Sequence, residues 1–137
     1  MVYTERIHLS TKGNSDIIDI TPETGRLLKT SGLKDGIACL CVVGSTGAIT
    51  TCEYEPGLER DLKEFFRKII PPGKYHHDQT WNDGNGHSHL SASLVGPSIA
   101  VPFVKGKLTL GTWQQVIFID FDTRPRDREI TVQFVGE

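Results

Sequence analysis

The spacing of apolar residues predicts two helices in this chain of 137 residues. The clearer one covers residues 57–70, because its apolar positions fall on one helical stripe; they are Leu58, Leu62, Phe65, Phe66 and Ile69. The stretch Pro71-Pro72-Gly73 ends it, since proline cannot continue a helix. An earlier helix begins at Thr21-Pro22, with Thr21 as its N-cap, and ends near Gly32.

Short apolar or alternating runs predict strands at residues 3–10, 17–20, 36–43, 48–54, 98–104, 114–121 and 128–135. Residues 90–94 add one or two helical turns. The strands do not alternate regularly with helices, as they would in a parallel sheet with crossover helices. The pattern therefore predicts an α+β fold with two or three helices, and the length fits a single domain over residues 1–137.

The composition is that of an ordinary globular protein and argues against other classes. The formal net charge of −2 gives no general positive field for nucleic acid. The longest apolar run, Ile37–Val43, is far shorter than the ~20 residues of a membrane span, and the N-terminus lacks the basic start and apolar stretch of a signal peptide. Cys39, Cys41 and Cys52 are odd in number and lie in strand-like segments. We therefore expect buried thiols in a reducing cytoplasm.

A polar loop predicted over residues 74–90 concentrates the side chains that bind metals. It contains four of the five histidines of the chain, and imidazoles and carboxylates are ligands of zinc. A turn over residues 83–86 would return the chain toward His77 and Asp78. The spacing matches no standard zinc motif, and a surface loop rich in polar residues is the alternative.

The local conformation decides whether His87 and His89 share an ion. In an extended segment the two side chains project to the same side. In a helix they point about 200° apart and cannot bind one ion.

Three further groups are candidates for binding or catalysis. The backbone N–H groups and hydroxyls of Ser45 and Thr46, within residues 44–47, would form a phosphate nest, although a hairpin turn explains the same residues. Glu53 at a strand end is a candidate general base, with a solvated carboxylate as the alternative. Asp61 borders the apolar stripe of the second helix, where an acid favoured by the helix dipole is the simpler explanation.

Aromatic and basic residues are open to structural and functional explanations alike. Trp81 and Trp113 are expected to pack in the core or at an interface, and walling a pocket for a flat ring is the alternative. Residues 124–128 contain three arginines and are expected to form a solvated turn. An inward-facing arginine such as Arg128 would instead bind a phosphate or a neighbouring subunit's carboxylate.

These segments together match one family pattern. The matching stretches are residues 44–51, 75–78, 83–90, 106–114 and 128–137. The chain resembles the YjbQ-like family, often labelled secondary thiamine-phosphate synthase, and the resemblance runs nearly end to end. It implies a compact domain built on a mostly antiparallel β-sandwich and assembled as a homotrimer.

The resemblance also implies a histidine metal site, with His77 and His89 on recurring positions. Other recurring positions are occupied by Glu53, Asp61, Asp78, Ser88, Trp113, Gln114 and Arg128. Many family members carry a histidine where this chain has Gly44, so His87, His76 or a water would have to replace that ligand. We expect His77, His87 and His89 to bind a divalent ion, zinc in the first place and magnesium as the alternative.

The family label predicts a small cytoplasmic trimeric enzyme that joins a pyrimidine pyrophosphate to a thiazole phosphate with loss of pyrophosphate. In this hypothesis Glu53, Asp61 and Asp78 are catalytic, and the phosphorylated substrate is bound by Ser45, Thr46, Ser88, Trp113, Gln114 and Arg128. Metal-dependent hydrolysis of a small ester or phosphoester, with Glu53 or Asp78 moving the proton, is one alternative. A non-catalytic trimeric ligand-binding protein is the other, and no partner is expected among nucleic acids or membranes.

Overall fold

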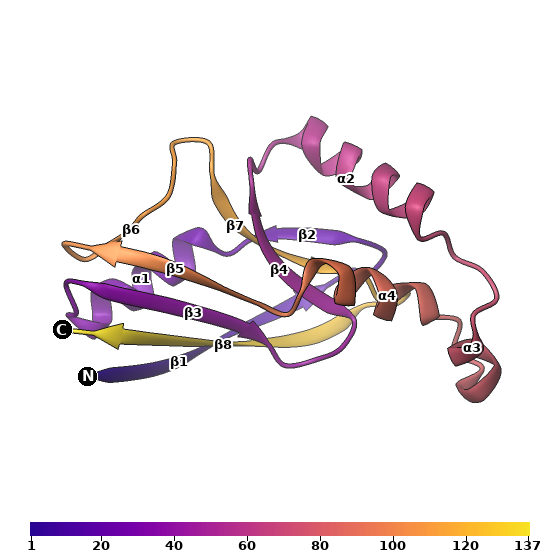
Figure 1. The fold of residues 1–137 in the computed structure, drawn as a ribbon, viewed down its shortest axis with the longest axis horizontal. Coiled ribbons are helices and arrows are strands. Elements are labelled where there is room, and N and C mark those ends of the chain that lie inside the picture. The colour runs from indigo at the N-terminus through magenta and orange to yellow at the C-terminus, as the bar shows by residue number, and fades with distance from the viewer.

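Two antiparallel sheets form the framework of the structure, a computed structural model that describes residues 1–137 (Figure 1). The larger sheet has the strand order β1-β8-β3-β5-β6, and the smaller has the order β2-β7-β4. The strands are β1 (Val2–Thr11), β2 (Asp16–Asp19), β3 (Gly36–Val42), β4 (Gly47–Cys52), β5 (Ser98–Val104), β6 (Lys107–Leu108), β7 (Gln115–Asp120) and β8 (Arg126–Gly136). The helices are α1 (Thr21–Ser31), α2 (Pro56–Ile69), α3 (His76–Trp81) and α4 (Gly86–Val95). The predicted α+β fold is confirmed, with four helices instead of two or three.

The core lies on both faces of the smaller sheet because side chains alternate along its strands. Phe118 of β7 faces the larger sheet and packs in one cluster with Phe103 and Phe134. Its neighbour Ile119 faces the other way, into a second cluster that contains Phe66 of α2 and Ala92 of α4. The molecule therefore has three layers, and α2 and α4 cover the outer face of the smaller sheet.

Helix α1 begins and ends where predicted, but its N-cap is a different residue. Its N-cap is Ile20, whose side chain makes no capping bond, and the Asp19 carboxylate accepts the N–H of Thr21 at 2.9 Å. The hydroxyl of Thr21 instead accepts a hydrogen bond from the backbone N–H of Val116 at 2.8 Å, which ties α1 to β7. The prediction of Thr21 as the cap was therefore wrong, whereas Gly32 ends the helix in the left-handed conformation that glycine favours.

Helix α2 is capped by Glu55 and held by fewer apolar residues than predicted. The Glu55 carboxylate accepts the N–H groups of Gly57 and Leu58 at 2.7 and 2.8 Å. These donors keep the pKa of Glu55 below its usual value. Of the predicted stripe only Phe66 is buried, while Phe65 is 51% exposed, so part of the apolar face of α2 meets solvent.

Several side chains expected in the interior lie at the surface. Trp81 and Trp113 are 71% and 73% exposed, which excludes core packing within one chain and leaves an interface or the wall of a pocket. The three cysteines are free, as predicted, but Cys39 is exposed and the other two are only partly covered. None of the helices has the length and apolar character needed to cross a membrane.

Candidate functional site

Residues 74–90, predicted as a polar loop, instead form two helices joined by a turn. The Asp78 carboxylate builds this corner: one oxygen accepts the N–H of Tyr75 at 3.3 Å, and the other accepts the N–H of Gly86 at 2.8 Å. The first bond caps α3, and the second fixes the start of α4. Asn82 ends α3 in a left-handed conformation, with φ at 54°.

The turn between α3 and α4 brings His77 and His89 together, with ring centroids 4.5 Å apart. His77 Nδ1 also lies 3.5 Å from Asp83 Oδ1 and 3.6 Å from Asp78 Oδ1. Ligand atoms of His77, Asp78 and Asp83 all lie within 4.8 Å of one another. We refer to these four side chains as the His77–His89 cluster.

The His77–His89 cluster has the composition of a metal site. His77 Nδ1 is buried and has no hydrogen-bond partner, which is costly unless something else satisfies it. Two imidazoles and two carboxylates form a ligand set that suits zinc. Asp83 was not predicted as part of the site, because the sequence Asp83-Gly84 is equally typical of a plain turn.

The environment of Asp78 fixes its charge. Burial of the carboxyl opposes ionisation, but the N–H groups of Gly86 and Tyr75 and the neighbouring His77 outweigh it and hold the pKa of Asp78 below its usual value. Asp78 is therefore a carboxylate at neutral pH, with both oxygens accepting backbone hydrogen bonds. These properties suit a positioning residue or a metal ligand better than a proton carrier.

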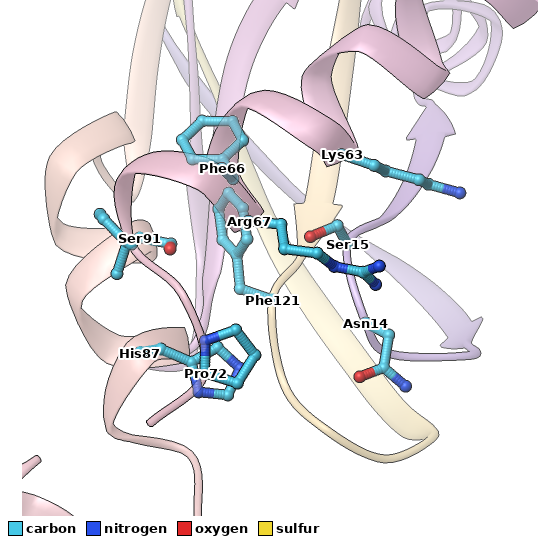
Figure 2. A pocket seen from close by; sticks show the side chains of 10 residues that line it. Asn14, Ser15, Lys63, Phe66, Arg67, Pro72, His87, Ser91 and Phe121 are labelled. Carbon is cyan, nitrogen blue, oxygen red and sulfur yellow. The ribbon is translucent and has the colours of Figure 1, made fainter. Parts of the chain in front are cut away.

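The third predicted ligand, His87, does not join the cluster. Because α4 begins at Gly86, His87 and His89 lie on a helix and point about 200° apart. His87 lines a cavity beneath α2 instead (Figure 2). Burial lowers the pKa of His87 despite the opposing charges of Asp78 and Asp122, so the imidazole is neutral at pH 7. The structure thus separates the predicted three-histidine set.

A buried ion-pair network occupies two residues that were predicted to bind phosphate. Arg128 binds both oxygens of Asp120, at 2.7 and 2.8 Å, and donates to the Thr46 hydroxyl at 2.6 Å. That hydroxyl in turn donates to Asp122 at 3.0 Å. The Thr46 hydroxyl therefore has no donor left for a phosphate oxygen, and Arg128 already neutralises a carboxylate of its own chain.

Asp122 is expected to make folding sensitive to acid. Burial opposes its ionisation, but the Thr123 N–H, Arg126 and Thr46 outweigh it and lower its pKa. Because the folded-state pKa lies below the unfolded value of ~3.9, ionised Asp122 stabilises the protein above that value, and the contribution disappears as the pH falls through the folded pKa. Urea unfolding from about pH 6 to about pH 3 should show a flatter acid limb in Asp122→Asn than in the wild type. The exposed Asp127→Asn is the control, and identical limbs for Asp122→Asn and wild type would contradict the expectation.

A second group of predicted residues lies at the other end of β4. Glu53 follows that strand, and Gln114 donates to the Thr51 hydroxyl at 3.1 Å beside it. The exposed Trp113 precedes Gln114. Residues 46 to 53 span roughly 20 Å of extended chain, so these three side chains lie far from Thr46 and from α4, which packs at that end.

The remaining predicted residues are isolated. Asp61 is exposed on α2, and Ser45 is exposed in the turn before β4. Ser88 is completely buried, and its hydroxyl has no hydrogen-bond partner. Of these three, only Ser88 lies in the helix that carries His89.

Comparison with known proteins supports the resemblance found in the sequence. The family model described as UPF0047 protein YjbQ-like matches residues 5–137. This chain belongs to that family. A UPF0047 protein of Archaeoglobus fulgidus is 40% identical over 91% of this chain and 95% of the relative. The UPF0047 protein YugU of Bacillus subtilis is 31% identical over 95% of this chain and 97% of YugU.

Solved structures share the whole fold. A YbjQ-like protein of unknown function from Sulfolobus solfataricus has a TM-score of 0.93 and 34% identity, covering 100% of this chain and 99% of that one. A hypothetical protein from Aeropyrum pernix has a TM-score of 0.92 and 32% identity, covering 98% of this chain and 99% of that one.

The surroundings of Gly44 explain why this position suits glycine here. A Cβ atom at Gly44 would lie 2.9 Å from an Nη1 nitrogen of Arg128. A histidine at that position would therefore require Nη1 of Arg128 to shift, although Asp120 is bound by Nε and Nη2 of the same guanidinium. In this chain the side chain of Arg128 takes the space beside the turn.

Proposed function

We propose that this chain forms a homotrimeric, metal-dependent enzyme that joins a pyrimidine pyrophosphate to a thiazole phosphate with loss of pyrophosphate. The observation that carries the proposal is the His77–His89 cluster, in which the buried Nδ1 of His77 has no hydrogen-bond partner and lies near two carboxylates and the His89 ring. The substrates are suggested by the label that goes with the family resemblance. Both parts are open to direct test.

The residues of the cluster divide into ligands and a positioning residue. His77 and His89 would hold the ion, zinc for preference, with Asp83 as a further ligand. A bound divalent ion supplies positive charge that offsets the departing pyrophosphate. Asp78 ties Tyr75 to Gly86 and so sets the spacing between α3 and α4, on which the distance between the two imidazoles depends.

The separation of the predicted residues supports a site shared between subunits. Glu53, Trp113 and Gln114 lie too far from the His77–His89 cluster for one small substrate to touch both groups of the same chain. In a trimer, a neighbouring copy would supply the second group. The exposed side chains of Trp81 and Trp113 favour such an interface, because a partner subunit would remove their apolar surface from water.

Within one chain, the geometry argues against metal-dependent hydrolysis. Hydrolysis needs a general base close to the ion, and Asp78 and Glu53 were the candidates. Both Asp78 oxygens already accept backbone hydrogen bonds, and its pKa is low. Glu53 lies at the other end of β4, so it would reach the ion only from a neighbouring subunit.

The proposal predicts that the wild-type protein carries near-stoichiometric zinc and converts both precursors with release of pyrophosphate. His77→Ala and His89→Ala should lose the metal, because removing a direct ligand costs more than the roughly 10–100-fold in affinity lost with an outer-shell partner. His87→Ala is the matched control in the same helix and should keep the metal. Elemental analysis and a pyrophosphate-release assay measure the two properties.

Two results would contradict the proposal in different ways. No metal in the wild-type protein, even after zinc is offered, would show that the His77–His89 cluster is not an ion site. Bound metal without turnover above the His89→Ala background would remove the synthase function. Thermal stabilisation by the phosphorylated compounds without turnover would favour the ligand-binding alternative.

A further inference from the structure

A second polar site lies on the opposite side of α4 from His89. It is a cavity of about 80 Å³ between α2, α4, the turn that joins β1 to β2, and the end of β7 (Figure 2). Phe66 and Phe121 form an apolar wall, with rings in edge-to-face contact at 4.8 Å. The proposed function makes no use of this cavity.

The cavity is lined by hydrogen-bond donors and contains no acid. Arg67 of α2 extends along the cavity toward Asn14 and Ser15, while the side chain of Lys63, which also lines it, points away (Figure 2). None of its ten lining residues is aspartate or glutamate. None of the ion pairs of the chain involves Arg67 or Lys63. The guanidinium of Arg67 therefore has no balancing carboxylate among the residues that line the cavity.

Two further polar groups from α4 line the same cavity. Ser91 is only 2% exposed, and its hydroxyl points toward the cavity (Figure 2). His87 Nδ1 is buried and has no hydrogen-bond partner. Buried polar atoms are nearly always hydrogen-bonded, so the His87 nitrogen indicates that the cavity holds something polar.

We propose that this cavity binds a small oxyanion, such as inorganic phosphate or the phosphate group of a monoester. Cationic and neutral donors converge on it from α2, α4 and the turn, as recognition of phosphate oxygens requires. The volume of about 80 Å³ is several times the ~10–15 Å³ that one water molecule requires, so the cavity has room for an oxyanion.

A structural role for the cations is the competing explanation. Arg67 and Lys68 lie in the last turn of α2, where positive charge is favourable to the helix dipole. Lys68 has that position without lining the cavity, so it separates the two explanations. A helix-dipole effect involves both residues, whereas oxyanion binding involves Arg67 alone.

The test is a calorimetric titration of the full chain with inorganic phosphate at constant ionic strength, with chloride as the reference anion. We expect saturable binding that weakens about 10- to 100-fold in Arg67→Met and falls in Ser91→Ala, since each variant removes a donor. Lys68→Met should bind as the wild type does. His89→Ala should also retain binding, which keeps this site distinct from the His77–His89 cluster.

A parallel titration with glycerol phosphate distinguishes the two sources of the anion. Tighter binding of inorganic phosphate indicates the free ion, and equal or tighter binding of the monoester indicates the phosphate of a larger molecule. Binding that Arg67→Met and Ser91→Ala leave unchanged would overturn the proposal. So would the absence of binding at roughly 10 mM phosphate, or equal losses in Arg67→Met and Lys68→Met. Loss of phosphate binding in His89→Ala alone would place the anion at the metal cluster and likewise overturn it.

Discussion

Replacing Arg128 by methionine is expected to lower the free energy of unfolding by about 3–5 kcal/mol. Arg128 binds both oxygens of Asp120, which is completely buried. Methionine fills much of the volume but leaves Asp120 as an uncompensated charge in the interior. The loss is large compared with the ~5–15 kcal/mol that stabilises a typical domain, so the variant will unfold at much lower urea concentration.

The double variant Asp120→Asn/Arg128→Met identifies the cause of this loss. Once the carboxylate is removed as well, no buried charge is left unpaired, and much of the stability should return. Arg124→Met, at an exposed position of the preceding turn, is the control and should change little. Urea unfolding followed by far-ultraviolet circular dichroism is the suitable measurement, because both tryptophans are already exposed in the folded state. A loss below about 1 kcal/mol in the single variant would show that the pair contributes no more than a surface ion pair.

The strands and the two longer helices were predictable because local pattern and tertiary packing agree in them. The alternation in β8 places Ile130, Val132 and Phe134 in the core, as expected from a period of two. The α3–α4 corner was not predictable in the same way. Its helices depend on the Asp78 carboxylate bridging two segments eight residues apart, and hydrophobic periodicity carries no sign of such a bond.

The sequence predicted the segment that contains the candidate site, but not the full set of side chains that meet there. The histidine-rich segment and a turn predicted a shared site, but the pair His77 and His89, which the structure brings together, came from the family resemblance. The exclusion of His87 required the helical state of α4, which the sequence left open. The use of Arg128 and Thr46 in an internal network depended on Asp120 and Asp122, whose burial follows from long-range strand pairing.

A mixture of two inactive variants is expected to recover catalytic activity if the site is shared between subunits. In the proposed shared site, one subunit contributes the metal half, with His77 and His89, and its neighbour contributes the other half, with Trp113. His89→Ala damages the metal half, and Trp113→Ala damages the half from the neighbour. Each should release little pyrophosphate from the two precursors when it forms trimers alone. Unfolding and refolding the two together at equal concentration randomises the subunits. In each site, the metal half is intact with a probability of about one half, and so is the half from the neighbouring subunit. Roughly a quarter of the sites therefore have both halves intact.

The recovered fraction distinguishes the possible arrangements of the site. A site built within one chain recovers nothing, because every subunit in the mixture carries one damaged half. A shared site recovers about a quarter of the wild-type rate, and the recovery should vanish when the double variant His89→Ala/Trp113→Ala replaces either partner. A refolded mixture of wild type with the double variant is the control for losses during refolding. Because β4 keeps Glu53 and Trp113 away from the His77–His89 cluster of the same chain, we expect the result for a shared site.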